Sequence, residues 1–449
     1  MYAVRQIQQE TAPPPSPARR HKTAAMKVTV VSPALDPWLR GQAINGTRHA
    51  AALRPFKRGE FGTGAASPTE GHLLAVNELI STLRNELLKL TKRTACAVKT
   101  ASREPSTQNL QHVLKLKENA HNWVRAIEQI WDFYFELFGQ RQSAPYNDWL
   151  LSCDRIGLDC YQAVFMGVGI AKSIPAPPPF SYMRTGFSPA TFRRGIPLRR
   201  LGRQLNPFPL IQLPYHRLVN PWTLGAILHE VSHNLQNELG LAKAIPRNIA
   251  RRLLAQGRGR FVASVWTRWN RETFADMSGL LLGGPAIVAS LMDTVGRAPA
   301  SVMNYAPRAP HPTPYLRTFI SIELLRRMGF PDEAKQYYRA WTRLYPKPDA
   351  GTIPPALLKD FHDVIATVVD TICFQPYAEL GNKSLAQVTM FDSRRQQMVE
   401  EAARRLAAGN DPGIIPERFL IGAARFAFDH RLARPGVISE NFYKELSRR

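Results

Sequence analysis

Two histidines four residues apart carry the clearest chemical signal in this sequence. Residues 228–234 read Leu-His-Glu-Val-Ser-His-Asn, so His229, Glu230 and His233 form an HExxH motif. A spacing of four places both imidazoles on one face of a helix, where they can bind one metal ion. Glu230 is rotated by about 100° from His229 and so lies beside the metal rather than on it. The motif predicts a zinc site in which Glu230 takes a proton from the water that zinc activates.

A catalytic zinc site needs a third protein ligand and keeps one coordination position open. Metzincin peptidases would have Gly at position 236 and His at position 239, but this chain has Gln236 and Leu239. No histidine occurs between His233 and His311, so a nearby third histidine is also missing. The remaining common option is a glutamate on a following helix, and Glu272 supplies it.

Asp276 follows Glu272 by four residues, so both carboxylates lie on one face of the same predicted helix. From this position Asp276 can accept a hydrogen bond from the far nitrogen of a ligating histidine, which fixes the tautomer of the ring. An exposed acidic pair at this spacing is the alternative. The metal-site interpretation is favoured because the HExxH motif precedes the pair, and the two residues also end the acid-free run that follows Glu238.

HExxH followed by ExxxD on a later helix resembles the gluzincin metallopeptidases, the thermolysin-like branch of the zincins. The resemblance covers residues 208–282 and implies hydrolysis of peptide bonds. It implies that His229, His233 and Glu272 hold zinc and that Glu230 is the catalytic base. Asp276 would be the carboxylate behind the ligands.

Several gluzincin-like families also place a His or Tyr after the third ligand, where it stabilises negative charge on the carbonyl oxygen. In this chain the proline-rich stretch 297–314 contains His311, which is the leading candidate for this catalytic role. Tyr315 is the weaker alternative, with Arg317 as a support.

Helical periodicity dominates the rest of the chain. Apolar residues recur every three or four positions in long segments that begin near His72, after Pro105 and at Tyr146. Further helices are expected over residues 220–239, 261–282 and most of 315–447; Asn220 suits the N-cap of the first of these, and Gly240 suits its stop.

Strand signals are few. A short strand is expected over residues 27–31. Residues 208–213 are the only strand-like piece near the motif, and their proline neighbours predict an edge strand, because proline cannot donate to a ladder. The family resemblance implies that such a strand binds extended peptide by backbone pairing.

These patterns predict an α+β protein, predominantly helical, with a zincin-like core between helical N- and C-terminal units. The expected division is a flexible, basic, proline-rich arm (1–70), an N-terminal helical unit (71–172), the zincin catalytic core (173–314) and a C-terminal helical unit (315–449).

The chain is strongly basic, with a formal net charge of +24. Residues 160–271 contain sixteen Lys or Arg and two acidic residues. A positive field favours a peptide or protein substrate that is acidic. Two alternatives stay open: an arginine-rich binder of nucleic acid or an anionic surface, with the stretch 184–203 as its contact, and a zinc amidase acting on a non-protein substrate.

Four cysteines without a Cys-x-x-Cys pair predict free thiols rather than a disulfide framework or a cysteine zinc site. The N-terminal residues lack the apolar stretch of a signal peptide, and no apolar run is long enough to span a bilayer. We therefore expect a cytoplasmic protein. Export by a route that needs no such signal stays open.

Overall fold

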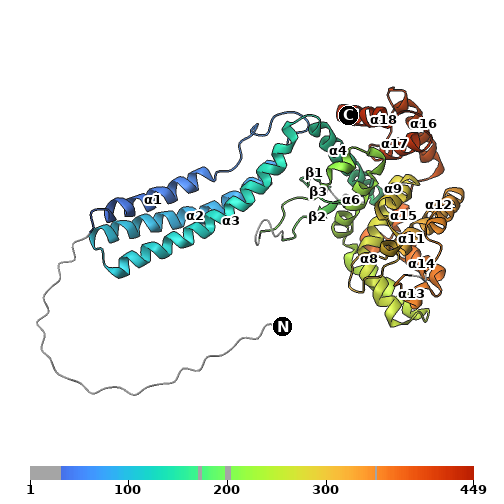
Figure 1. Cartoon of the computed structure of the whole chain (residues 1–449), viewed down its shortest axis with the longest axis horizontal. Helices are drawn as coiled ribbons and strands as arrows, with labels where there is room; N and C mark the ends of the chain where they lie inside the picture. The colour runs from blue at the N-terminus through green and yellow to red at the C-terminus, as the bar shows by residue number, and fades with distance from the viewer. Residues whose placement is uncertain (1–31, 170–173, 198–203, 349–350) are drawn as a thin grey trace, which may run out of the picture.

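The computed structural model describes residues 32–169, 174–197, 204–348 and 351–449. The strand expected over residues 27–31 lies outside these ranges, as does part of the arginine-rich stretch. The described chain is predominantly helical with one small three-stranded sheet (Figure 1). This confirms the predicted class at the level of a mostly helical α+β protein.

The elements in chain order are α1 Leu35–Ala52, α2 Glu70–Arg103, α3 Thr107–Gly139, η1 Gln140–Gln142, α4 Tyr146–Val168, β1 Phe180–Met183, β2 Ala190–Phe192, β3 Leu210–Leu213, α5 Tyr215–Leu218, η3 Pro221–Thr223, α6 Gly225–Glu238, α7 Leu241–Ala255, α8 Gly259–Gly283, α9 Ala286–Val295, α10 Pro299–Val302, α11 Pro314–Arg327, α12 Pro331–Leu344, α13 Pro355–Leu358, α14 Phe361–Val369, η5 Asp370–Phe374, η6 Ala378–Leu380, α15 Leu385–Val388, α16 Ser393–Ala407, α17 Phe419–Asp429 and α18 Pro435–Arg448.

The N-terminal helices α1, α2 and α3 lie side by side in a bundle that projects from the rest of the molecule (Figure 1). The side chains of Thr69 and Ser106 cap α2 and α3 by accepting hydrogen bonds from backbone N–H groups in the first turns. The apolar stripes of the two helices then face one another and form the core of the bundle.

Helix α1 corrects the prediction that residues 1–70 are a flexible arm. Within those residues, 35–52 form a helix that packs on α2, with Leu39 and Ala50 buried. Two buried positions in eighteen residues give almost no periodic signal. The helix is therefore stabilised by tertiary packing, which a local pattern does not reveal.

Helix α4 also differs from the predicted division, which grouped it with the N-terminal unit. It packs against α6 and α18 in the main body, and Cys153, Ile156 and Cys160 belong to the large core there. The four cysteines are free, as predicted. Within the described residues, no helix combines the length and apolarity needed to cross a membrane.

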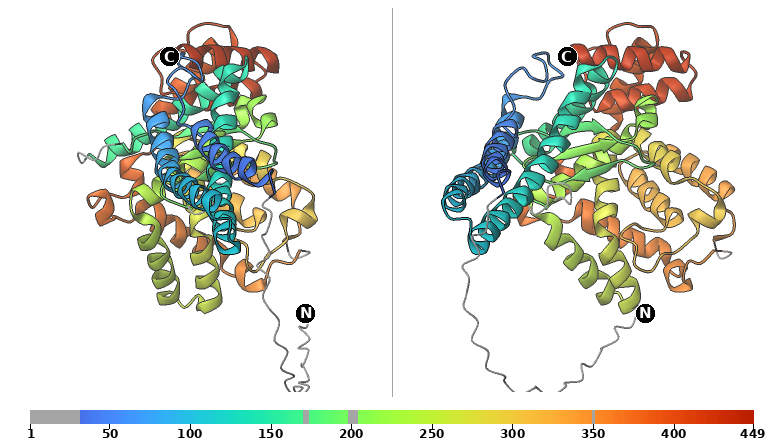
Figure 2. Two further views of the ribbon diagram at one scale, coloured as in Figure 1. Left: turned by 90° about the vertical axis from the view of Figure 1, so that its left-hand side faces the viewer. Right: turned by 60° about the vertical axis from the view of Figure 1, so that its left-hand side comes forward.

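The sheet lies where the bundle meets the main body (Figure 2). Its strand order is β1-β3-β2, with β1 parallel and β2 antiparallel to β3. The prediction of an edge strand over 208–213 is therefore wrong, because β3 is the central strand. Pro209 and Pro214 stand just outside the paired residues 210–213, so neither proline removes a donor from the ladder.

His72 joins the start of α2 to the segment before β1. Its ring is buried, with Nδ1 2.7 Å from Thr69 Oγ1 and Nε2 2.9 Å from the Pro178 carbonyl oxygen. Both contacts suit a neutral ring that accepts at Nδ1 and donates at Nε2. Burial lowers the pKa of His72 to about 4.

Stability is therefore expected to fall as the pH drops from about 6.5 to 4. The unfolded chain takes up a proton at His72 in this window and the folded chain does not, so stability is complete above 6.5 and is lost below it. Between pH 7.5 and 5 the loss is about 2 kcal/mol. Denaturant unfolding of the parent and His72→Gln should show that the variant lacks this component. His112 lies on an exposed face of α3, so His112→Gln should keep the pH-dependent loss of stability seen in the parent. Equal pH profiles for all three proteins would show that His72 is not its source.

Candidate metal centre

Helices α6 and α8 cross at close range and bring the predicted residues together. A Cβ built on Gly279 would stand 3.4 Å from the backbone nitrogen of His229, and one on Gly283 would stand 2.6 Å from Leu228 Cδ2. Glycines on α8 leave room for this approach, because a side chain at Gly283 would have to displace the side chains of Leu228 and Ile287. The two helices can therefore present side chains to one point.

Three side chains from these helices form a group that could hold a metal ion: His229 and His233 from α6, and Glu272 from α8. The two Nε2 atoms are 3.1 Å apart. Glu272 Oε2 is 3.4 Å from His229 Nε2, and its Oε1 is 3.5 Å from His233 Nε2. Ligand atoms about 2.1 Å from a tetrahedral zinc ion lie about 3.4 Å from one another. The donor atoms therefore fit a single ion of this size.

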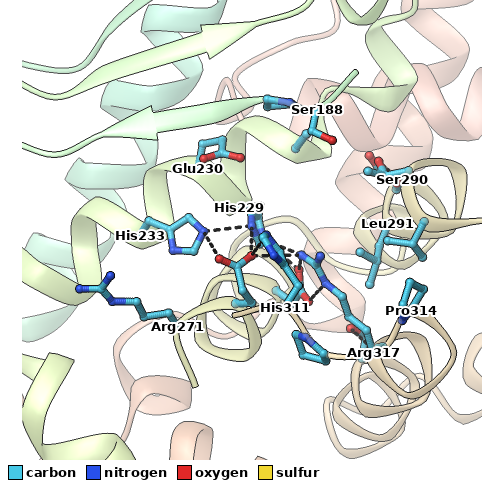
Figure 3. A pocket seen from close by; sticks show the side chains of 18 of the residues that line it. Ser188, His229, Glu230, His233, Arg271, Ser290, Leu291, His311, Pro314 and Arg317 are labelled. Carbon is cyan, nitrogen blue, oxygen red and sulfur yellow. Dashed lines mark hydrogen bonds and ion pairs between the residues drawn. The ribbon is translucent and has the colours of Figure 1, made fainter. Parts of the chain in front are cut away.

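Asp276 lies directly behind the group. Its Oδ1 is 2.8 Å from His229 Nδ1, so Nδ1–H donates to the carboxylate and Nε2 is the nitrogen that would bind a metal in place of its proton. Arg317, from α11, donates from Nε to Asp276 Oδ2 at 2.5 Å and from Nη2 to Oδ1 at 2.8 Å. Asp276 is thus held from two sides (Figure 3 shows the side chain of Arg317 beside His229).

Arg317 was predicted only as a support for the oxyanion residue. The structure gives it a different partner, since its guanidinium orients the carboxylate that orients His229. All three side chains are largely buried. The sequence shows that Arg317 is basic, but it does not show that α11 returns to α8, 41 residues after Asp276.

The charges of the group are tightly coupled. Burial opposes charge on His229, but ion pairing with Asp276 and the contact with Glu272 raise its pKa to about 10. Burial and the charged His229 together lower the pKa of His233 to about 3. Burial opposes the charge of Glu272, but the neighbouring histidines and Arg317 lower its pKa. Because a metal binds the unprotonated nitrogen, metal binding would compete with the proton that this raised pKa favours on His229.

Glu230 is buried at the cleft wall, one residue after His229. In Figure 3 it lies between the two histidines and the segment that carries Ser188. Burial raises its pKa to about 7, with the negative charge of Glu272 adding to the shift. A carboxyl group with a pKa near neutrality can both accept and return a proton, which is what a general base requires.

His311 reaches the same point from the loop before α11. Its Nε2 is 3.2 Å from Glu272 Oε2, and its side chain is 57% exposed. The structure thus brings His311 to the site. Tyr315 does not line the cleft: its ring is buried against Phe319, one turn further along α11.

A cleft of about 730 Å³ contains the group and is walled by β2, α6, α9 and the start of α11. Asn234 connects two of these walls, because its Nδ2 donates to Thr191 Oγ1 of β2 at 2.8 Å. Thr191 in turn donates to the Leu210 carbonyl oxygen of β3. Neither Asn234 nor strand β2 was singled out from the sequence, since three residues are too few for a strand pattern.

No protein-family model, no curated protein and no solved structure matches this chain. Comparison therefore assigns it to no family. Its structure supports the coarser statement that His229, His233 and Glu272 could together bind a metal ion.

Proposed function

We propose that this protein is a zinc-dependent hydrolase that cleaves peptide bonds, with Glu230 as general base. The observation that carries the proposal is the grouping of His229, His233 and Glu272 at distances suited to one ion, with Glu230 in the same cleft. Two imidazoles and one carboxylate are a common ligand set of catalytic zinc.

Zinc, when bound, supplies a Lewis acid that polarises the carbonyl group and lowers the pKa of water to about 7. Glu230 takes a proton from the attacking water and returns it to the leaving amine. Asp276 and Arg317 keep His229 in the tautomer whose Nε2 binds the metal. His311, exposed at the mouth of the site, donates to the carbonyl oxygen as negative charge develops there.

Strand β2 is well placed to hold an extended peptide. Among the described residues it pairs with β3 on one side only, and Ala190 and Thr191 line the same cleft as Glu230. A peptide can add to such an edge through main-chain hydrogen bonds. The binding of extended peptide, which the resemblance implied for residues 208–213, is therefore proposed for residues 190–192 instead.

Metal removal tests the proposal. Dialysis against a chelator should lower the rate of peptide cleavage by roughly 10³-fold, and one equivalent of zinc should restore it. Elemental analysis should find zinc in the parent and none in His229→Asn. Equal cleavage by the zinc-free and zinc-loaded protein would refute the mechanism. Cleavage of a non-peptide amide but of no peptide would change the substrate class to that of a zinc amidase.

A further inference from the structure

Two arginines line the cleft next to the elements that form the site. Arg193 directly follows β2, and Arg271 directly precedes Glu272 on α8. Both line the cleft. Figure 3 shows Arg271 beside His233, on the opposite side of the group from Leu291 and Pro314.

Within the described residues, these two arginines have no carboxylate partner. Neither guanidinium forms an ion pair with a carboxylate of the described residues, whereas Arg317 in the same cleft is paired with Asp276. Arg193 is half-buried, and burial together with the like charge of Arg271 lowers its pKa. Two cations that line one cleft, and that form no ion pair with a carboxylate of the described residues, make a favourable site for an anion.

The surroundings indicate which anion fits. Arg193 continues β2, so a peptide lying along that strand would pass directly over it. Arg271 directly precedes Glu272 on α8, which places Arg271 close to the bond to be cleaved. Helix α9 lines another part of the cleft with Ile287, Val288 and Leu291, beside Ser290 and Thr294, and Arg297 follows the helix. Apolar side chains suit a peptide better than a phosphate backbone.

We propose that Arg193 and Arg271 form a carboxylate-binding subsite that selects peptides with an acidic group within about two residues of the cleaved bond. This inference rests on the proposed peptidase function and names the substrate class for the same cleft. The carboxylate is that of an Asp or Glu side chain, or that of the peptide C-terminus. Guanidinium groups bind both through charge-assisted hydrogen bonds.

Matched peptides test the subsite. Cleavage sites are first mapped by mass spectrometry on a mixed peptide library, and the preferred peptide is then made with Asp or Asn at each position around the cleaved bond. The Asp peptide should have a kcat/KM roughly 10- to 100-fold above that of its Asn partner. Each peptide is also made with a free and an amidated C-terminus, which distinguishes the two sources of the carboxylate.

Variants assign the effect to the two arginines. Arg193→Gln and Arg271→Gln should each bring the ratio of kcat/KM for the Asp peptide to kcat/KM for the Asn peptide towards one. Arg271→Glu should favour peptides with Lys at the same position. Arg260→Gln is the matched control, because Arg260 is an exposed arginine on α8 that does not line the cleft. Its ratio should equal that of the parent. A ratio near one in the parent, or one unchanged in both Gln variants, overturns the subsite.

A binding assay separates failure of the subsite from failure of the peptidase function. In Glu230→Gln, the affinity for Asp and Asn peptides is measured by calorimetry, with and without Arg271→Gln. If the parent cleaves Asp and Asn peptides equally well, the proposed peptidase function stands and the proposed subsite is refuted. If the Asp peptide binds in an arginine-dependent way but the parent does not cleave it, the proposed subsite stands and the proposed peptidase function is refuted. Arginine-dependent binding of an oligonucleotide, with no discrimination between peptides, overturns the peptide assignment.

Discussion

Replacing Glu230 by Gln should abolish measurable peptide cleavage while zinc binding is retained. Glutamine keeps the size and polarity of the side chain but cannot accept a proton. General base catalysis typically contributes roughly 10²- to 10⁴-fold. The substitution leaves His229, His233 and Glu272 unchanged, so the three donor atoms can still meet at one ion. The loss should therefore appear in kcat/KM, with a zinc content equal to that of the parent.

The control for this substitution is Glu440→Gln, the same change on the exposed face of α18. It should cleave peptides at the parental rate. If Glu230→Gln cleaved a peptide library as fast as the parent, Glu230 would not be the base. If it lost both zinc and activity, the carboxylate would be needed to form the site, and its role would be structural.

The secure part of the site follows from local geometry. A spacing of four on one helix places His229 and His233 on the same face, whatever the distant parts of the chain do. Glu272 was reached by excluding the other ligand patterns, and the structure places its carboxylate 3.4 Å from His229 Nε2. The same spacing rule placed Asp276 on the face of Glu272, where it now contacts His229. Each of these pairs lies on a single helix, so its members share one face by spacing alone.

What the sequence did not predict depends on contacts between distant segments. Strand β2 has only three residues, and its pairing with β3 is decided by the fold rather than by a local pattern. The prolines at 209 and 214 suggested an edge, but their effect depends on whether they stand inside or outside the paired residues. Likewise, Arg317 became the partner of Asp276 only when α11 packed against α8.

This distant partner leads to a second prediction with a large effect. Arg317→Met should lower the free energy of unfolding of the zinc-free protein by about 3–5 kcal/mol. Arg317 is buried, and its ion pair with Asp276 is made by two hydrogen bonds. Methionine fills similar space without the charge, so the Asp276 carboxylate would stay buried with His229 as its remaining partner. Chemical denaturation of the two zinc-free proteins measures the difference.

The same helix provides the control. Arg326 also pairs with a carboxylate, that of Glu323, but its side chain is 57% exposed. Arg326→Met should therefore cost at most about 1 kcal/mol, because water screens an exposed pair. Equal losses for the two substitutions would show that burial of the Arg317 pair is unimportant.

In Asp276→Asn combined with Arg317→Met, the total loss should be smaller than the sum of the single losses, since each single change leaves a buried charge without its partner. Zinc affinity should fall in both single variants, because each frees the ring of His229 from the arrangement that directs its Nε2 towards Glu272.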